Sequence, residues 1–76
     1  MNNERRNKLK NIMKTLSSIV NDIEKVKGEE EDYMDNMPEN LQGSDRYTKA
    51  EEACECLENA IENIENAIED IDTARE

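Results

Sequence analysis

The second half of the chain is built from a seven-residue repeat, which constrains the fold more than any other feature of the sequence. Four consecutive heptads run from Tyr47 to Ala74, with apolar or small residues at the first, fourth and seventh positions. Such a repeat is typical of an α-helix that packs along one seam against another helix. It predicts a helix at about residues 44–75, with Ser44 as its N-cap.

The first half carries a less regular heptad pattern. Counted from Leu9, the first and fourth positions hold Leu9, Ile12, Leu16, Ile19, Ile23, Val26, Glu30, Tyr33 and Met37, and the fifth positions include Met13, Val20 and Met34. This spacing predicts a helix at about residues 3–36, in which the first and fourth positions form the seam and the fifth positions form a flank. Pro38 ends the helix, because the residue before a proline avoids the helical conformation.

A short connection at about residues 37–43 joins the two helices. Long helices linked in this way fold back on each other. We therefore expect residues 1–76 to form one all-α domain, an antiparallel, coiled-coil-like two-helix hairpin. Pairing first positions with opposing fourth positions places Leu9 opposite Ile71 and Val26 opposite Cys54.

The hairpin has more apolar surface than its seam covers. Only 34% of the 76 residues are hydrophobic and none is Phe or Trp, so the core alone supplies no more than about 3–5 kcal/mol. The flanks hold Met13, Val20 and Met34 on the first helix and the seventh-position alanines Ala53, Ala60, Ala67 and Ala74 on the second. This surplus predicts a third body. The sequence favours homodimerisation into a four-helix bundle over docking onto a foreign protein.

The charge is distributed unevenly. Twenty acids against ten bases give a net charge of −10, divided into +4 over residues 1–27, −6 over 28–43 and −8 over 44–76. Between Ala50 and Ala74 there are nine acids and no base. Seven of these acids occupy second and fifth heptad positions and form what we call the acidic stripe: Glu51, Glu55, Glu58, Glu62, Glu65, Glu69 and Asp72.

The acidic stripe has two interpretations. Acids at these positions are ordinary solubilising residues, and some can pair with the basic first helix. However, like charges three and four residues apart destabilise a helix by a few tenths of a kcal/mol per pair, roughly, and no base is interleaved to offset this. The second interpretation is a surface for a basic partner.

Residue types that support other functions are missing. The chain has no His to act as a general base or metal ligand, so we expect no enzyme activity, no cofactor and no metal site. Cys54 and Cys56 point to different sides of a helix, which predicts a small seam residue and an exposed thiol in a reducing compartment. No apolar run approaches the roughly 20 residues of a membrane span, and the net charge disfavours direct nucleic-acid binding.

The segment from Asp35 to Ala53 reads DNMPENLQGSDRYTKAEEA. It resembles a segment in small acidic helical proteins of phages and prophages of Gram-positive bacteria, which share the basic start and heptad tail. Most of these proteins have no assigned function, so no functional residue is carried over. The resemblance implies a phage origin and the cytoplasm of an infected or lysogenic host. Small acidic phage proteins commonly inhibit bacterial defence or host enzymes, some as nucleic-acid mimics.

We therefore expect a non-enzymatic inhibitor of a bacterial antiviral defence complex, of the anti-CRISPR or anti-restriction type, or of a host nuclease. In this interpretation the acidic stripe mimics nucleic acid and binds a host protein with a basic surface. The alternative is a structural homodimer or scaffold with no inhibitory role.

Overall fold

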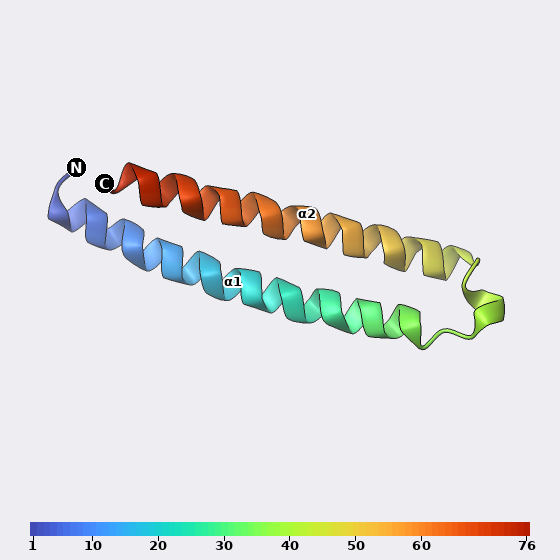
Figure 1. The fold of residues 1–76 in the computed structure, drawn as a ribbon. Coiled ribbons are helices and arrows are strands. Elements are labelled where there is room, and N and C mark those ends of the chain that lie inside the picture. Colours follow the sequence, from blue (N-terminus) through green and yellow to red (C-terminus); the bar gives the residue numbers. More distant parts are fainter.

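The computed structural model describes residues 1–76 as two long helices joined by a short 3₁₀ turn. Helix α1 spans Asn3–Asp35, the turn η1 spans Glu39–Leu41, and α2 spans Asp45–Ala74. The helices run antiparallel, with both chain ends at one end and η1 at the other (Figure 1). The prediction of an all-helical chain is confirmed, and the shape is that of a helical hairpin. Neither helix has a stretch long and apolar enough to cross a membrane.

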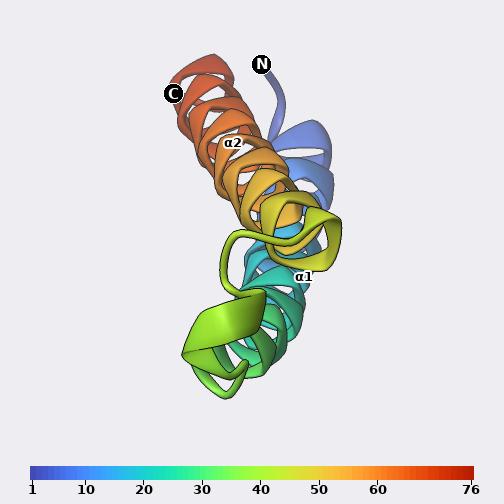
Figure 2. The same cartoon turned by 90° about the vertical axis from the view of Figure 1, so that its right-hand side faces the viewer.

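The molecule is a rod one helix pair thick. Its Cα atoms extend over 59 × 15 × 11 Å. Seen from the turn, α1 and α2 form the whole structure, and no further element covers either side of the pair (Figure 2). Both broad faces of the hairpin are therefore open.

Polar side chains fix the start of each helix. Asn2 Oδ1 accepts a hydrogen bond from the Arg5 backbone N–H at 2.8 Å. Ser44 Oγ accepts one from the Tyr47 backbone N–H at 3.4 Å. These bonds satisfy N–H groups that have no partner inside the first turn of a helix. The prediction that Ser44 caps the second helix is confirmed.

Helix α2 packs against α1 through the positions that the repeat predicts. Ala50 and Ile61 are each 3% exposed. The other first- and fourth-position residues are half-buried, namely Tyr47, Cys54, Leu57, Ile64, Ile68 and Ile71. This seam follows directly from the heptad pattern.

Helix α1 meets α2 through a different stripe from the predicted one. Val20 is 8% exposed, and its neighbours on the same side are half-buried: Leu9, Met13, Leu16, Ile23, Lys27, Glu30, Met34 and Met37. The fourth-position residues, which we call the exposed apolar stripe, are 40–54% exposed: Ile12, Ile19, Val26 and Tyr33. The predicted seam of the first helix was therefore wrong, because its first and fifth positions, and not its fourth, face α2.

The pairing of the two helices differs accordingly. Cys54 Sγ lies 3.9 Å from Met34 Sδ, where the predicted register placed Val26. Lys27 Nζ lies 3.0 Å from Glu58 Oε2 on the facing helix. The partners of α2 residues therefore lie farther along α1 than predicted, by eight residues in the case of Cys54.

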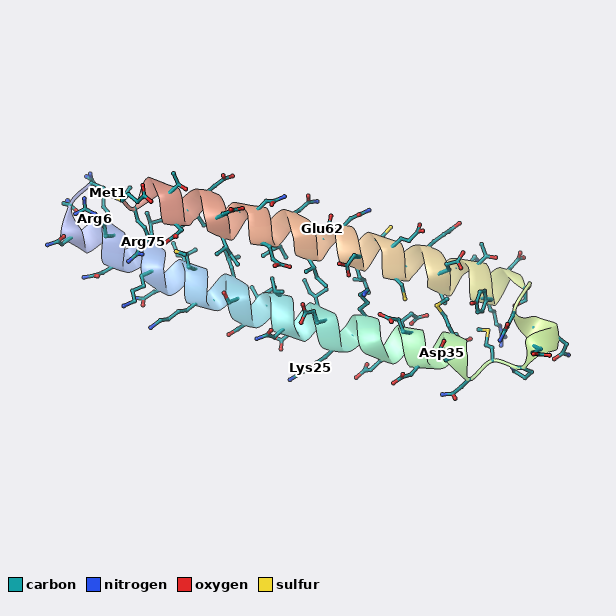
Figure 3. All side chains as sticks on the ribbon, viewed as in Figure 1. Met1, Arg6, Lys25, Asp35, Glu62 and Arg75 are labelled. Atoms are coloured by element: carbon teal, nitrogen blue, oxygen red, sulfur yellow. The ribbon has the colours of Figure 1, made fainter.

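A pair of arginines closes the open end of the hairpin. Arg6 Nε donates to the Arg75 carbonyl at 2.9 Å, and Arg6 Nη2 donates to the Glu76 carbonyl at 3.0 Å. In return, Arg75 Nε donates to the Arg6 carbonyl at 3.4 Å, and the two side chains lie together at this end (Figure 3). Since the last carbonyls of a helix lack intrahelical partners, Arg6 caps the C-terminus of α2 from the neighbouring helix.

Candidate functional site

All seven carboxylates of the acidic stripe are exposed along α2. Two of them form ion pairs within the chain: Glu58 with Lys27 at 3.0 Å and Asp72 with Arg75 at 3.5 Å. The remaining five have no ion pair within the chain: Glu51, Glu55, Glu62, Glu65 and Glu69. The hairpin therefore presents most of this charge to solvent.

The basic residues of α1 neutralise little of the stripe. Lys8 pairs with Glu4 on its own helix at 3.4 Å, and Lys25 points away from α2 (Figure 3). Lys27 is the single α1 base whose ion pair reaches α2. The pairing that the sequence allowed between the stripe and the first helix is thus limited to one contact.

Lys27 is a charged residue in the seam. Its Nζ lies 3.1 Å from Glu31 Oε1 and 3.0 Å from Glu58 Oε2, and its side chain is 26% exposed. The hydrogen bonds to Glu58 and Glu31 raise the pKa of Lys27 above its ordinary value of 10.5, because both stabilise the ammonium form. Lys27 therefore stays charged at neutral pH and joins the two helices beside the acidic stripe.

Helix α1 adds carboxylates that the sequence did not indicate as part of the site. Two open hollows between the helices are lined by acids from both: Glu24, Glu31 and Asp35 from α1, and Glu51, Glu55 and Glu65 from α2. We call the acidic stripe together with the three α1 residues the acidic face. A seam formed by the first and fifth heptad positions of α1 would have indicated these three residues, because it brings their side of α1 next to the acidic stripe.

The exposed apolar stripe lies on the other side of the seam. At about 100° per residue, Ile19 and Glu24 fall on opposite sides of a seam that contains Val20. On α2, Ala60 and Glu58 are separated in the same way. Because Glu24 and Glu58 border the acidic face, Ile19 and Ala60 share the opposite flank. The hairpin is therefore acidic on one face and apolar on the other.

The structure divides the predicted docking flank in two. Val20 is buried and Met13 and Met34 are half-buried, on the side of α1 that meets α2. These three residues belong to the seam and do not form a free flank. The alanines remain at the surface, with Ala60 half-buried and Ala53, Ala67 and Ala74 exposed. The apolar surface of α1 beside them is the exposed apolar stripe.

Both cysteines are free thiols. Cys54 is half-buried in the seam and Cys56 is exposed, as predicted. Burial raises the pKa of Cys54, and the nearby carboxylates of Glu31 and Glu30 raise it further, against an opposing effect of Lys27. Its thiol form is thereby favoured over the reactive thiolate. No group of three or more His, Cys, Asp or Glu side chains is arranged to hold a metal ion.

The acidic face carries ten exposed carboxylates on two packed helices, and seven of them have no ion pair within the chain. Its geometry comes from two helices whose positions are fixed by the seam, Lys27 and the arginine pair at the open end. No protein-family model, no curated protein and no solved structure matches the chain.

Proposed function

We propose that the chain is a non-enzymatic interaction protein whose acidic face occupies a basic, nucleic-acid-binding surface of a host protein. Its role is that of a phage-encoded inhibitor of a bacterial antiviral defence complex or a host nuclease, in the cytoplasm of the infected or lysogenic cell. The observation that carries the proposal is the row of five exposed carboxylates on α2 with no ion pair in the chain.

The spacing of the charges supports mimicry of a nucleic-acid strand. From Glu51 to Asp72 the helix rises by about 31 Å, so the stripe has one carboxylate about every 5 Å. Phosphates recur about every 3.4 Å along one strand of a duplex. Glu24, Glu31 and Asp35 add charges from the second helix across the hollows.

The helical support of the charges favours binding. A helix held in a hairpin presents its charges without the ordering cost that a disordered acidic tail would meet on binding. Charge complementarity over such a surface speeds association and selects basic partners. Binding of this kind weakens with salt, because the Debye length falls from about 10 Å at 0.1 M to about 3 Å at 1 M.

The test is capture of host proteins by the chain and by a variant in which the five unpaired acids become glutamine. That variant carries Glu51→Gln, Glu55→Gln, Glu62→Gln, Glu65→Gln and Glu69→Gln. Glutamine retains side-chain length and helix propensity, so the variant changes charge alone. The expected result is a nucleic-acid-binding host protein that the wild type captures and inhibits, that about 1 M salt releases, and that the variant does not bind.

A matched control neutralises five exposed acids outside the acidic face. It carries Glu4→Gln, Glu29→Gln, Glu52→Gln, Asp70→Asn and Glu76→Gln, all at exposed positions. The control has the same net charge as the five-glutamine variant and should retain the partner. Equal capture and inhibition by all three proteins would refute the charge-mimic mechanism.

A structural homodimer or scaffold is the second candidate function. It is favoured by the exposed apolar stripe, because four large side chains at seven-residue spacing are 40–54% exposed on one side of α1. Contiguous apolar surface of this kind marks interaction sites on soluble proteins. This candidate predicts self-association that the five-glutamine variant retains, and no captured host protein.

A further inference from the structure

We propose that the flank formed by the exposed apolar stripe and the alanines binds a second copy of the chain, with the turn of each copy at the open end of the other. The two hairpins then form a four-helix bundle whose two acidic faces point outward. The inference rests on the homodimer candidate of the proposed function, and it does not require that the acidic face bind a host protein.

The hairpin exposes more surface than a compact monomer of its mass. Its accessible surface is 5772 Å² and three of its 76 residues are buried. A folded monomer of 8.8 kDa exposes about 4,800 Å² by the usual scaling of surface with mass. The excess of about 1,000 Å² compares with the roughly 800 Å² that each partner buries in a standard interface. A single interface with another hairpin therefore covers the excess.

Helix α1 leaves an apolar stripe uncovered although its seam with α2 contains two charged residues. The buried side of α1 includes the half-buried charged residues Lys27 and Glu30. The exposed apolar stripe has Ile, Ile, Val and Tyr at four successive heptads and no polar member. Burial of a large aliphatic side chain stabilises by about 1.5–3 kcal/mol, and α2 covers the seam of α1 but leaves this stripe 40–54% exposed. Its position outside indicates a second apolar contact.

The distribution of charge along α1 favours opposite directions for two α1 helices that pack together. The acidic face lies on the opposite side, so two chains of charge −10 meet where their charges are few. Residues 1–27 carry +4 and residues 28–43 carry −6. In an arrangement with the two turns at opposite ends of the bundle, residues 1–27 of each copy lie beside residues 28–43 of the other. Turns at the same end would bring the two acidic segments together.

A two-fold axis beside Ile19 gives the register. This axis places Ile19 against Ile19 of the second copy, and Ile12 against Val26 of the second copy. Lys8, one turn from Ile12 on the edge of the stripe, then lies opposite Glu29 of the second copy. Apolar and charged positions are matched in the same register, which is the complementarity that a specific interface requires.

Light scattering tests the self-association. The wild type at about 100 μM should have twice the mass of 8.8 kDa, whereas Ile19→Glu should have the single mass. Each dimer of the variant would bury two carboxylates, so its Kd should rise about 100-fold or more. The matched control is Ser18→Glu, which adds the same charge at the neighbouring exposed position and should remain dimeric. A monomeric wild type, or an equal loss with Ser18→Glu, would overturn the proposal.

Disulfide cross-linking tests the geometry without relying on a disruptive charge. In a Cys54→Ala, Cys56→Ser background, Ile19→Cys should cross-link to itself under mild oxidation, because the two Cβ atoms meet at the axis. Turns at the same end would instead set Ile19 across the diagonal of the bundle. Ile12→Cys should cross-link only when mixed with Val26→Cys.

The two readouts separate this inference from the proposed host interaction. Self-linking of Ile12→Cys, or failure of Ile19→Cys to link, would overturn the arrangement. A monomeric wild type that still captures a basic host protein would refute self-association alone. A dimeric wild type that captures none would refute the host interaction alone.

Discussion

Truncation of two valines on α1 tests which stripe faces α2. Val20 is 8% exposed and Val26 is 54% exposed. Valine to alanine removes the equivalent of two methylenes, each worth about 0.8 kcal/mol when buried. The transfer loss is therefore about 1.5 kcal/mol at Val20 and about half of that at Val26. Alanine is the better helix former and returns about 0.5 kcal/mol at both positions.

The net expectation is a loss in the free energy of unfolding of about 1 kcal/mol for Val20→Ala and about 0.2 kcal/mol for Val26→Ala. Urea titration followed by far-UV circular dichroism measures both. The pair is compared in the Ile19→Glu background, so that a second copy does not cover Val26. An equal loss at the two sites, or a larger loss at Val26, would mean that the fourth positions face α2 and that the observed seam is incorrect.

Three further predictions follow from the caps, the seam lysine and the thiols. Ser44→Ala should lower the free energy of unfolding by about 1 kcal/mol, because α2 loses its N-cap, whereas Ser18→Ala should have little effect; urea titration compares them, and similar losses would contradict the capping role. The contribution of Lys27 to stability should be constant up to its ordinary pKa of 10.5 and decrease at higher pH, because the pKa is raised in the folded state. Lys27→Met should remove this alkaline decrease in the urea midpoint. If the midpoint of the variant depended on pH as that of the wild type does, the stabilising role of Lys27 would be contradicted. A thiol reagent near pH 8 should modify Cys56 before Cys54, since Cys54 is half-buried and its pKa is raised; faster labelling of Cys54 in mass spectrometry would refute this.

The sequence predicts the helices well because the repeat is a local property. Helix α2 has only two large apolar positions per heptad, so its seam has a single solution, and Ala50 and Ile61 are buried accordingly. Helix α1 has apolar residues at three positions per heptad, so periodicity defines a wide stripe and not a seam. Which part of that stripe meets α2 depends on the fit between the helices. For this reason Val20 lies in the seam and Val26 lies outside it, the reverse of the prediction.

The candidate site also has a part that the sequence predicts and a part that depends on how the helices pack. The acidic stripe lies on one helix, so its alignment could be read from spacing alone. The contribution of Glu24 and Glu31 depends on how α1 is rotated about its own axis, which the sequence did not determine. The ion pair between Lys27 and Glu58 depends in addition on the register of the two helices. Properties of one helix were predictable, and properties of the pair were not.

The position of the best packing along the rod has a consequence for how the chain folds. Val20 and Ile61, the two large buried side chains, are about 40 residues apart in sequence, whereas the seam nearer the turn buries the small side chain of Ala50 and contains Lys27, Glu30 and Cys54. Closure of a loop of about 40 residues costs about 1.2 kcal/mol more than closure of about 10, by the logarithmic dependence on length. Contacts that form next to the turn therefore contribute little stabilisation. Folding must first bring the middles of the two helices together. Stiffening of the connection would slow unfolding more than it would speed folding.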